Sequence, residues 1–225
     1  MSQAILIFDE LRGFYKSKIM VILWIGMPLL AFIVHFLGGV ESFGVPMSYL
    51  TAMLVSSISG TLGSVSLSTS ITNEKNRHVY DMFLIRPVQR WEILFSKYIA
   101  VYACLLLAIA LSVLVGLVID TITIGSIPVM LLVKTAESIG TCVVGTALAC
   151  AIGMFFGVMM SSVQAAALLS IFVGNQITTF TAFFSIIPAS MAAEFSPLFF
   201  SYITCIGIAA LFLVITLTKF NKLQF

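Results

Sequence analysis

Six apolar runs, each long enough to cross a lipid bilayer as a helix, occupy most of this sequence. They cover Ile19–Gly39, Met47–Ile71, Ile93–Ile119, Ile139–Met160, Val163–Ile187 and Leu198–Thr218. A membrane-spanning helix needs about 20 predominantly apolar residues, whereas a membrane β-barrel is built from shorter segments of alternating polarity. The runs therefore predict an all-α membrane protein with six transmembrane helices.

The composition argues against a soluble fold. Of the 225 residues, 60% are apolar and only 9% are charged, against about 25% charged residues in an ordinary soluble domain. A soluble protein of this length exposes a large surface to water, and this chain has too few polar residues to cover it. We therefore set aside a soluble enzyme, a disordered region and a nucleic-acid-binding domain, and take lipid as the solvent for most of the chain.

The first 18 residues have a helical pattern of their own and do not resemble a signal peptide. Apolar residues recur at intervals of three and four, at Ala4, Ile7, Leu11, Phe14 and Tyr15, and charged residues lie on another face, at Asp9, Arg12 and Lys16. The pattern predicts an amphipathic helix (residues 1–18) in the membrane interface, followed by a six-span transmembrane domain (residues 19–225). The alternative is a polar tail that happens to be helical.

Lysine and arginine residues are distributed unevenly between the connections. If the N-terminus is cytoplasmic, ten of them lie on the cytoplasmic side, and only Lys134 lies outside. Cytoplasmic loops of membrane proteins carry an excess of these residues. The distribution predicts a multi-pass protein of the cell membrane with both termini in the cytoplasm.

The sequence lacks the motifs of several membrane enzymes and channels. It has no Gly-Lys pair for an ATP-binding Walker A loop, no H-E-x-x-H or G-x-S-x-G motif and no TVGYG filter. Its four cysteines lie in apolar runs without the spacing of metal ligands. We predict that this chain has no catalytic residue, no metal site and no enzymatic activity. It either conducts passively or obtains energy from another protein.

The longest polar stretch, Thr72–Glu92, connects the second and third runs. It begins with charged residues and becomes apolar halfway along. Pro87 ends any helix there, because the residue before a proline avoids the α conformation. On a cytoplasmic helix, Met82 and Phe83 would be exposed to water unless a partner covered them. The stretch predicts a short amphipathic helix that ends near Arg86 and docks on a partner; alternatively, its apolar side chains enter the lipid interface.

This stretch also resembles the signature of the ABC-2 family of transporter permeases. In that family an acidic-basic cluster is followed by an apolar stretch, a Pro-Val pair, an arginine and a lysine at the start of the third span. The matching residues are Glu74, Lys75, Arg77, Leu84, Pro87, Val88, Arg90, Glu92, Ile93, Leu94 and Lys97. The sequence departs from the family at His78-Val79, where Gly-Thr is common, and at Ser96, where glycine is common. Topology and length are similar over the whole chain.

The resemblance implies the membrane subunit of an ATP-driven transporter, most relatives being exporters. Such a subunit forms the translocation pathway as a dimer with a second copy or a paralogue. Two cytoplasmic ATPase subunits bind ATP and Mg, and the permease itself holds no cofactor. The ATPase-coupling residues would then be Arg77, Tyr80, Met82, Phe83, Arg86 and Pro87.

Small and polar residues inside the runs indicate packing and pathway positions. Four small residues recur at intervals of four in the fourth run, at Gly145, Ala149, Gly153 and Gly157, and such a stripe predicts close helix packing. Polar residues in the second and fifth runs include Ser56, Ser59, Asn175, Gln176 and Thr179. These side chains either bond a neighbouring helix or line a wet cavity. The resemblance favours the cavity, because these two spans line the pathway in relatives.

Two other functions remain open from the sequence. One is a membrane scaffold or sensor that binds an ATPase without moving a solute. The other is a channel or carrier that works without ATP. The substrate is not indicated by any motif, and the direction of transport follows from the resemblance alone.

Overall fold

The computed structural model describes residues 3–43, 47–77, 90–124, 129–184 and 197–222. Over these residues the secondary structure is helical, without a strand, so the prediction of an all-α chain is confirmed there. The helices are α1 (Gln3–Tyr15), α2 (Lys18–Phe43), α3 (Met47–Asn76), α5 (Arg90–Ile124), α6 (Val129–Met159), α7 (Val163–Phe184) and α8 (Pro197–Lys222).

Three of these helices contain segments long and apolar enough to cross a membrane, among the residues described. The segments are Trp91–Ile122 in α5, Thr135–Met159 in α6 and Ser201–Phe220 in α8. Helices α1 and α2 meet at a bend of 65° and together give at most a fourth crossing. These helices are consistent with a membrane protein, and the six crossings and the interfacial position of α1 stay predictions.

Local chemistry explains several helix boundaries. At the corner between α1 and α2, the Ser17 N–H donates to the Phe14 carbonyl at 3.0 Å, which closes the last turn of α1. Between α6 and α7, the Ser162 carbonyl accepts the first helical hydrogen bond, from the Ala166 N–H at 3.0 Å. Helix α8 begins at Pro197, whose fixed backbone angle suits the first position of a helix and whose missing N–H is not needed there.

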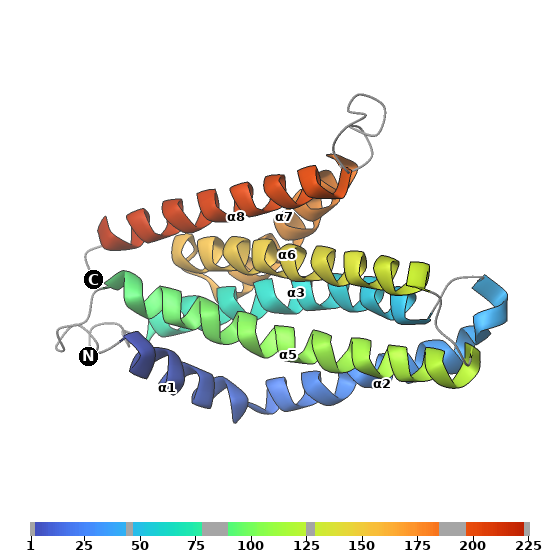
Figure 1. Cartoon of the computed structure of the whole chain (residues 1–225). Coiled ribbons are helices and arrows are strands. Elements are labelled where there is room, and N and C mark those ends of the chain that lie inside the picture. The colour runs from blue at the N-terminus through green and yellow to red at the C-terminus, as the bar shows by residue number, and fades with distance from the viewer. Residues whose placement is uncertain (1–2, 44–46, 78–89, 125–128, 185–196, 223–225) are drawn as a thin grey trace.

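The helices form a bundle with α3, α5 and α6 at its centre, in which α3 and α6 run parallel to each other and antiparallel to α5 (Figure 1). Helix α3 packs against α5, α6 and α7. The pair α1–α2 flanks the bundle beside α5, and the pair α7–α8 flanks it beside α6 (Figure 1). Both chain termini lie at the same end of the bundle, which we call the termini end; the other is the distal end (Figure 1).

Polar side chains fasten α2 to α5 within the bundle. The Trp24 indole Nε1 donates to the Cys104 carbonyl at 3.0 Å, and the Ser112 hydroxyl donates to the Met27 carbonyl at 3.0 Å. Met27 directly precedes Pro28, which lies inside α2 and cannot donate a backbone hydrogen bond. The two side-chain bonds therefore hold α2 to α5 within the turn that Pro28 weakens.

The core and the exterior of the bundle are both largely apolar. Leu67, Leu105 and Leu148 are fully buried between the central helices. On the outside, Ile22 of α2 is 70% exposed and Phe172 of α7 is 64% exposed. Extended apolar exteriors are unusual in soluble proteins and are suited to lipid.

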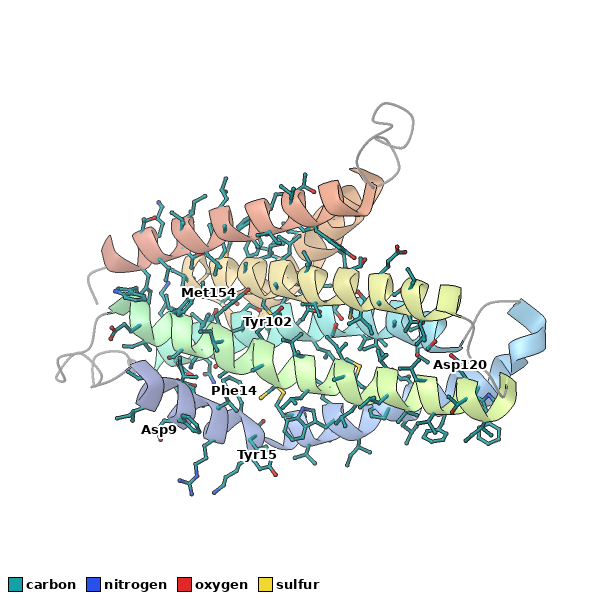
Figure 2. All side chains as sticks on the ribbon, viewed as in Figure 1. Asp9, Phe14, Tyr15, Tyr102, Asp120 and Met154 are labelled. Atoms are coloured by element: carbon teal, nitrogen blue, oxygen red, sulfur yellow. The ribbon has the colours of Figure 1, made fainter. Side chains whose placement is uncertain are left out.

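The face that helix α1 turns to the bundle coincides only in part with its predicted apolar stripe, of which Ile7, Leu11 and Phe14 are half-buried. Leu6 is buried and Phe14 is half-buried, so the face toward α5 runs through these residues. Tyr15, which belongs to the predicted apolar stripe, points away from the bundle and is 56% exposed (Figure 2). The apolar arc of α1 is wider than its contact with α5, and Phe8 and Tyr15 lie on the part left outside.

Candidate functional site

A buried lysine at the termini end of the bundle joins three helices. Lys97 of α5 is 3% exposed, and its Nζ donates a hydrogen bond to Oε1 of Glu74 in α3. Oε1 of Glu10 in α1 lies 3.7 Å from the same ammonium nitrogen. The Ser70 hydroxyl donates to Glu74 Oε1 at 3.1 Å. We call Glu10, Glu74 and Lys97 the lysine cluster; it places two carboxylates around one ammonium group.

A second set of bonds ties the same end of α3 to α6. The Lys75 Nζ donates to the Val158 carbonyl at 2.9 Å, and the Thr72 hydroxyl donates to the Gly157 carbonyl at 3.1 Å. Carbonyls in the last turn of a helix have no partner within the helix, and a basic side chain there also interacts favourably with the helix dipole. The end of α3 is thus held by α5 on one side and by α6 on the other.

These bonds hold the helices on either side of the connection that is predicted to dock on a partner. Of the six predicted coupling residues, Arg77 is described and is exposed directly after α3. The other five lie outside the described residues: Tyr80, Met82, Phe83, Arg86 and Pro87. The structure describes the two helices that flank the connection, α3 and α5, and Glu74 and Lys97 hold them together. We call this pair and the helix ends around it the base of the connection.

The carboxyl group of Glu10 lies in an environment that disfavours its charge. Burial is the main cause and raises the pKa of Glu10 above its usual range; Lys97 lowers this pKa, and Glu74 raises it further. Lys97 cannot fully compensate the burial of Glu10, because it already bonds to Glu74. The sequence analysis missed Glu10. The sequence did contain a signal for it: Glu10 lies four residues after Leu6 and four before Phe14, so all three share one helix face.

Hydroxyl groups of α3 bond to the helices on either side. Ser59 and Thr146 of α6 share a hydrogen bond of 3.0 Å, and Ser68 and Ser170 of α7 share one of 3.1 Å. All four side chains are buried. A hydroxyl has one proton, so in each pair one hydroxyl donates to the other, and the second donates to a carbonyl of its own helix, for example Ser59 to Ser56 at 3.1 Å or Thr146 to Cys142 at 2.7 Å.

The five predicted pathway residues lie in different surroundings. Ser59 is fully buried between α3 and α6 and bonds to Thr146. An interhelical bond was the alternative to a place in a wet cavity. Ser56 is half-buried, and Asn175 and Gln176 of α7 are exposed. Thr179 lies in α7, but its side chain is outside those described. The four described side chains therefore differ in burial, and the shared pathway stays a prediction.

The stripe of small residues in α6 faces α3. A Cβ atom on Gly153 would overlap the backbone of Ser64, and one on Gly157 would lie 3.1 Å from the Ser68 Cα. Ala149 is buried, and its Cβ lies 3.5 Å from where a Cβ on Gly60 would be. A Cβ on Gly145 would have 4.0 Å to its nearest neighbour, the Ser56 hydroxyl. The closest approach of the two helix backbones is therefore at Gly153 and Gly157.

A buried acid lies at the distal end of the bundle. The Asp120 carboxylate of α5 accepts a hydrogen bond of 2.8 Å from the Ser48 N–H in the first turn of α3, and Asp120 is fully buried (Figure 2). The Ser48 hydroxyl shares a bond of 3.1 Å with Thr135 of α6. An acid at a helix N-terminus satisfies an orphan N–H and interacts favourably with the helix dipole. The sequence analysis did not single out Asp120.

Two findings bear on cofactors and on relatives. Within the described ranges, no three side chains of the types His, Cys, Asp and Glu are grouped so as to hold a metal ion, and the four cysteines are free and buried. No family model matches the chain, and no curated protein matches it.

Proposed function

We propose that this protein is the membrane subunit of an ATP-driven transporter of the ABC-2 type. It lies in the cell membrane as a homodimer or beside a paralogue, with both termini cytoplasmic. Residues 78–89 dock on a separate ATPase subunit that binds ATP and Mg. Export is the direction that the sequence resemblance favours.

The observation that carries this proposal is the fixed base of the 78–89 connection. A segment that transmits the movement of an ATPase must be joined to helices that move as a unit. Otherwise the segment would move without displacing the rest of the bundle. Glu74 and Lys97 bond the helix before the connection to the helix after it. Lys75 and Thr72 bond the first of these helices to α6. A force on the connection would therefore reach α3, α5 and α6 together.

The spacing of charges along α5 supports the proposed position in the membrane. Between Lys97 and Asp120 the sequence contains no charged residue. In a helix, the 23 residue steps between them correspond to about 35 Å, close to the hydrocarbon thickness of about 30 Å. The two residues would thus lie near the two boundaries of the hydrocarbon, and the lysine cluster would lie at the membrane surface on the termini side.

Exposed amides on α7 support a polar pathway beside this helix. Asn175 and Gln176 are exposed in the isolated chain, and amide groups facing hydrocarbon are costly. They are better accommodated against water or against another protein chain. Helices α3 and α7 are in contact, so Ser56 on α3 and these amides on α7 would line neighbouring parts of one pathway in a dimer.

The proposal is tested by purifying the tagged protein in mild detergent from its native membrane. We expect a chain with a Walker A motif to co-purify in a one-to-one ratio and the complex to hydrolyse ATP. Reconstituted in vesicles, the complex should accumulate or release a candidate solute only with ATP. Co-purification and hydrolysis without any transport would indicate a scaffold or sensor, and transport by this chain alone would indicate an independent channel or carrier.

A further inference from the structure

The lysine cluster has one carboxylate more than it has cations. Glu74 is bonded directly to Lys97 and also accepts from Ser70. Glu10 lies 3.7 Å from the ammonium nitrogen, beyond the usual range of a hydrogen bond. Glu74 therefore neutralises Lys97. Glu10 is attracted only to an ammonium group whose charge is already balanced by another acid.

Docking of α1 forces Glu10 into this position. Helix α1 packs on α5 and has only a small contact with α2. Its contact face runs through Leu6, Glu10 and Phe14, which follow each other at intervals of four. When Leu6 and Phe14 pack against the bundle, the carboxyl group between them must leave water. When α1 detaches, Glu10 regains water.

The charged groups around Glu10 come from three helices. Among the described side chains, Lys97 of α5, Glu74 of α3 and Asp9 of α1 itself act on it. Lys97 favours the charged carboxylate, while Glu74 and Asp9 disfavour it. Burial adds the largest contribution and also disfavours the charge, so the pKa of Glu10 is higher when α1 is docked than when α1 is free.

We propose that α1 docks on the bundle together with a proton on Glu10, which makes α1 a detachable helix controlled by pH. Because the pKa of Glu10 is higher in the docked state than in the detached state, the docked state binds the proton more tightly. Docking is therefore strongest below the ordinary pKa of a glutamate. It weakens as the pH rises through the raised pKa of the docked state. The helix is therefore held tightly in acid and loosened as the pH rises.

Docking of α1 affects the helices that flank the 78–89 connection, because the lysine cluster joins all three. Glu10 contacts the lysine that also fixes the base of the 78–89 connection. Detachment of α1 leaves Lys97 to Glu74 alone and removes one helix from that base. The proton-linked docking itself depends only on the lysine cluster; its influence on coupling rests on the proposed function.

Hydrogen exchange of the full chain in detergent micelles tests the proposal. We expect the protection of α1 amides, corrected for intrinsic exchange rates, to fall as the pH rises above the ordinary range of a glutamate carboxyl, by at most about tenfold per pH unit. Protection of α6 serves as the internal reference for folding. Glu10→Gln, which mimics the protonated acid, should keep α1 protected at the higher pH and remove the pH dependence. Glu137→Gln, which neutralises an exposed acid of α6 that does not act on Glu10, should keep the wild-type dependence.

Two results would overturn the proposal. Loss of α1 protection in Glu10→Gln at every pH would mean that the ion pair with Lys97 holds the helix. Equal protection of wild-type α1 across the pH range would mean that docking takes up no proton. Neither result bears on whether an ATPase binds, so the proposed function is tested separately.

Discussion

Lys97 of α5 donates a hydrogen bond to Glu74 of α3, and the two residues face each other across the base of the 78–89 connection. They are 23 positions apart in the sequence. Lys97 is almost completely buried, and Glu74 is 27% exposed. A buried ion pair adds little net stability. Removing one partner is costly, however, because the other charge stays buried without compensation. The pair therefore serves mainly to fix how α3 and α5 meet.

Lys97→Met should destabilise the bundle because it leaves two partly buried carboxylates without a cation. We expect a loss on the order of 3 kcal/mol in the free energy of unfolding, measured by denaturant unfolding in detergent. Lys219→Met is the matched control, since Lys219 is exposed on α8, and it should change stability by no more than about 0.5 kcal/mol. Equal stability of the two variants would mean that the lysine cluster does not support the fold.

Gly153→Ala should weaken the contact between α6 and α3. The new methyl group would overlap the backbone of Ser64, and overpacking of this kind costs about 1–3 kcal/mol. Gly145→Ala, in the same stripe, has space for the methyl group and should be neutral or stabilising, because alanine favours helices over glycine. Thermal unfolding in detergent measures both. If the two variants had the same midpoint, α6 and α3 would not approach closely at Gly153.

The helix boundaries were largely predictable, and the helix faces were not. The predicted run Ile19–Gly39 became α2, which spans Lys18–Phe43, and the run Met47–Ile71 became α3. Apolar runs reveal helices directly, because lipid leaves the backbone no other way to satisfy its hydrogen bonds. Helices exceed the runs because they continue beyond the apolar part; α6, for example, begins ten residues before the predicted Ile139.

Which face of a helix meets which neighbour depends on long-range contacts that periodicity does not contain. In α1 the apolar arc includes both Phe14, which packs on the bundle, and Tyr15, which does not. In α3, hydroxyls occur on every face, so the sequence could not single out Ser59 and Ser68 as the ones that bond other helices. Asp120 could not be singled out from the sequence, because its partner, the Ser48 N–H, is a backbone group 72 positions away.

Cysteine accessibility should separate packing positions from pathway positions. Ser59→Cys should not react with a water-soluble maleimide, because Ser59 is buried against Thr146. Ser56→Cys and Gln176→Cys should react in native membranes if both positions face a wet pathway. The four native cysteines are buried, so the wild-type protein gives a low background. Failure of both Ser56→Cys and Gln176→Cys to react would remove these residues from the pathway.

Single cysteines at the proposed cytoplasmic and outer positions test the orientation. A cysteine at Gln224 should be labelled by an impermeant reagent only from the cytoplasmic side of vesicles, and one at Ser42 only from the outside. The reason is the excess of Lys and Arg in the segments assigned to the cytoplasm. Labelling of both positions from the same side would contradict the proposed topology.

The most direct test of the account is whether Phe83 anchors an ATPase. Truncating a buried aromatic anchor typically costs about 2 kcal/mol, or about thirtyfold in affinity. Phe83→Ala should therefore lose most of the co-purifying ATPase and its ATP hydrolysis while the bundle stays folded. Phe8→Ala is the control, since Phe8 is an aromatic residue of α1, 77% exposed, at the same end of the bundle; it should retain the ATPase. If Phe83→Ala retains the ATPase and hydrolysis at the wild-type level, residues 78–89 are not the docking segment, and the transporter proposal loses its physical basis.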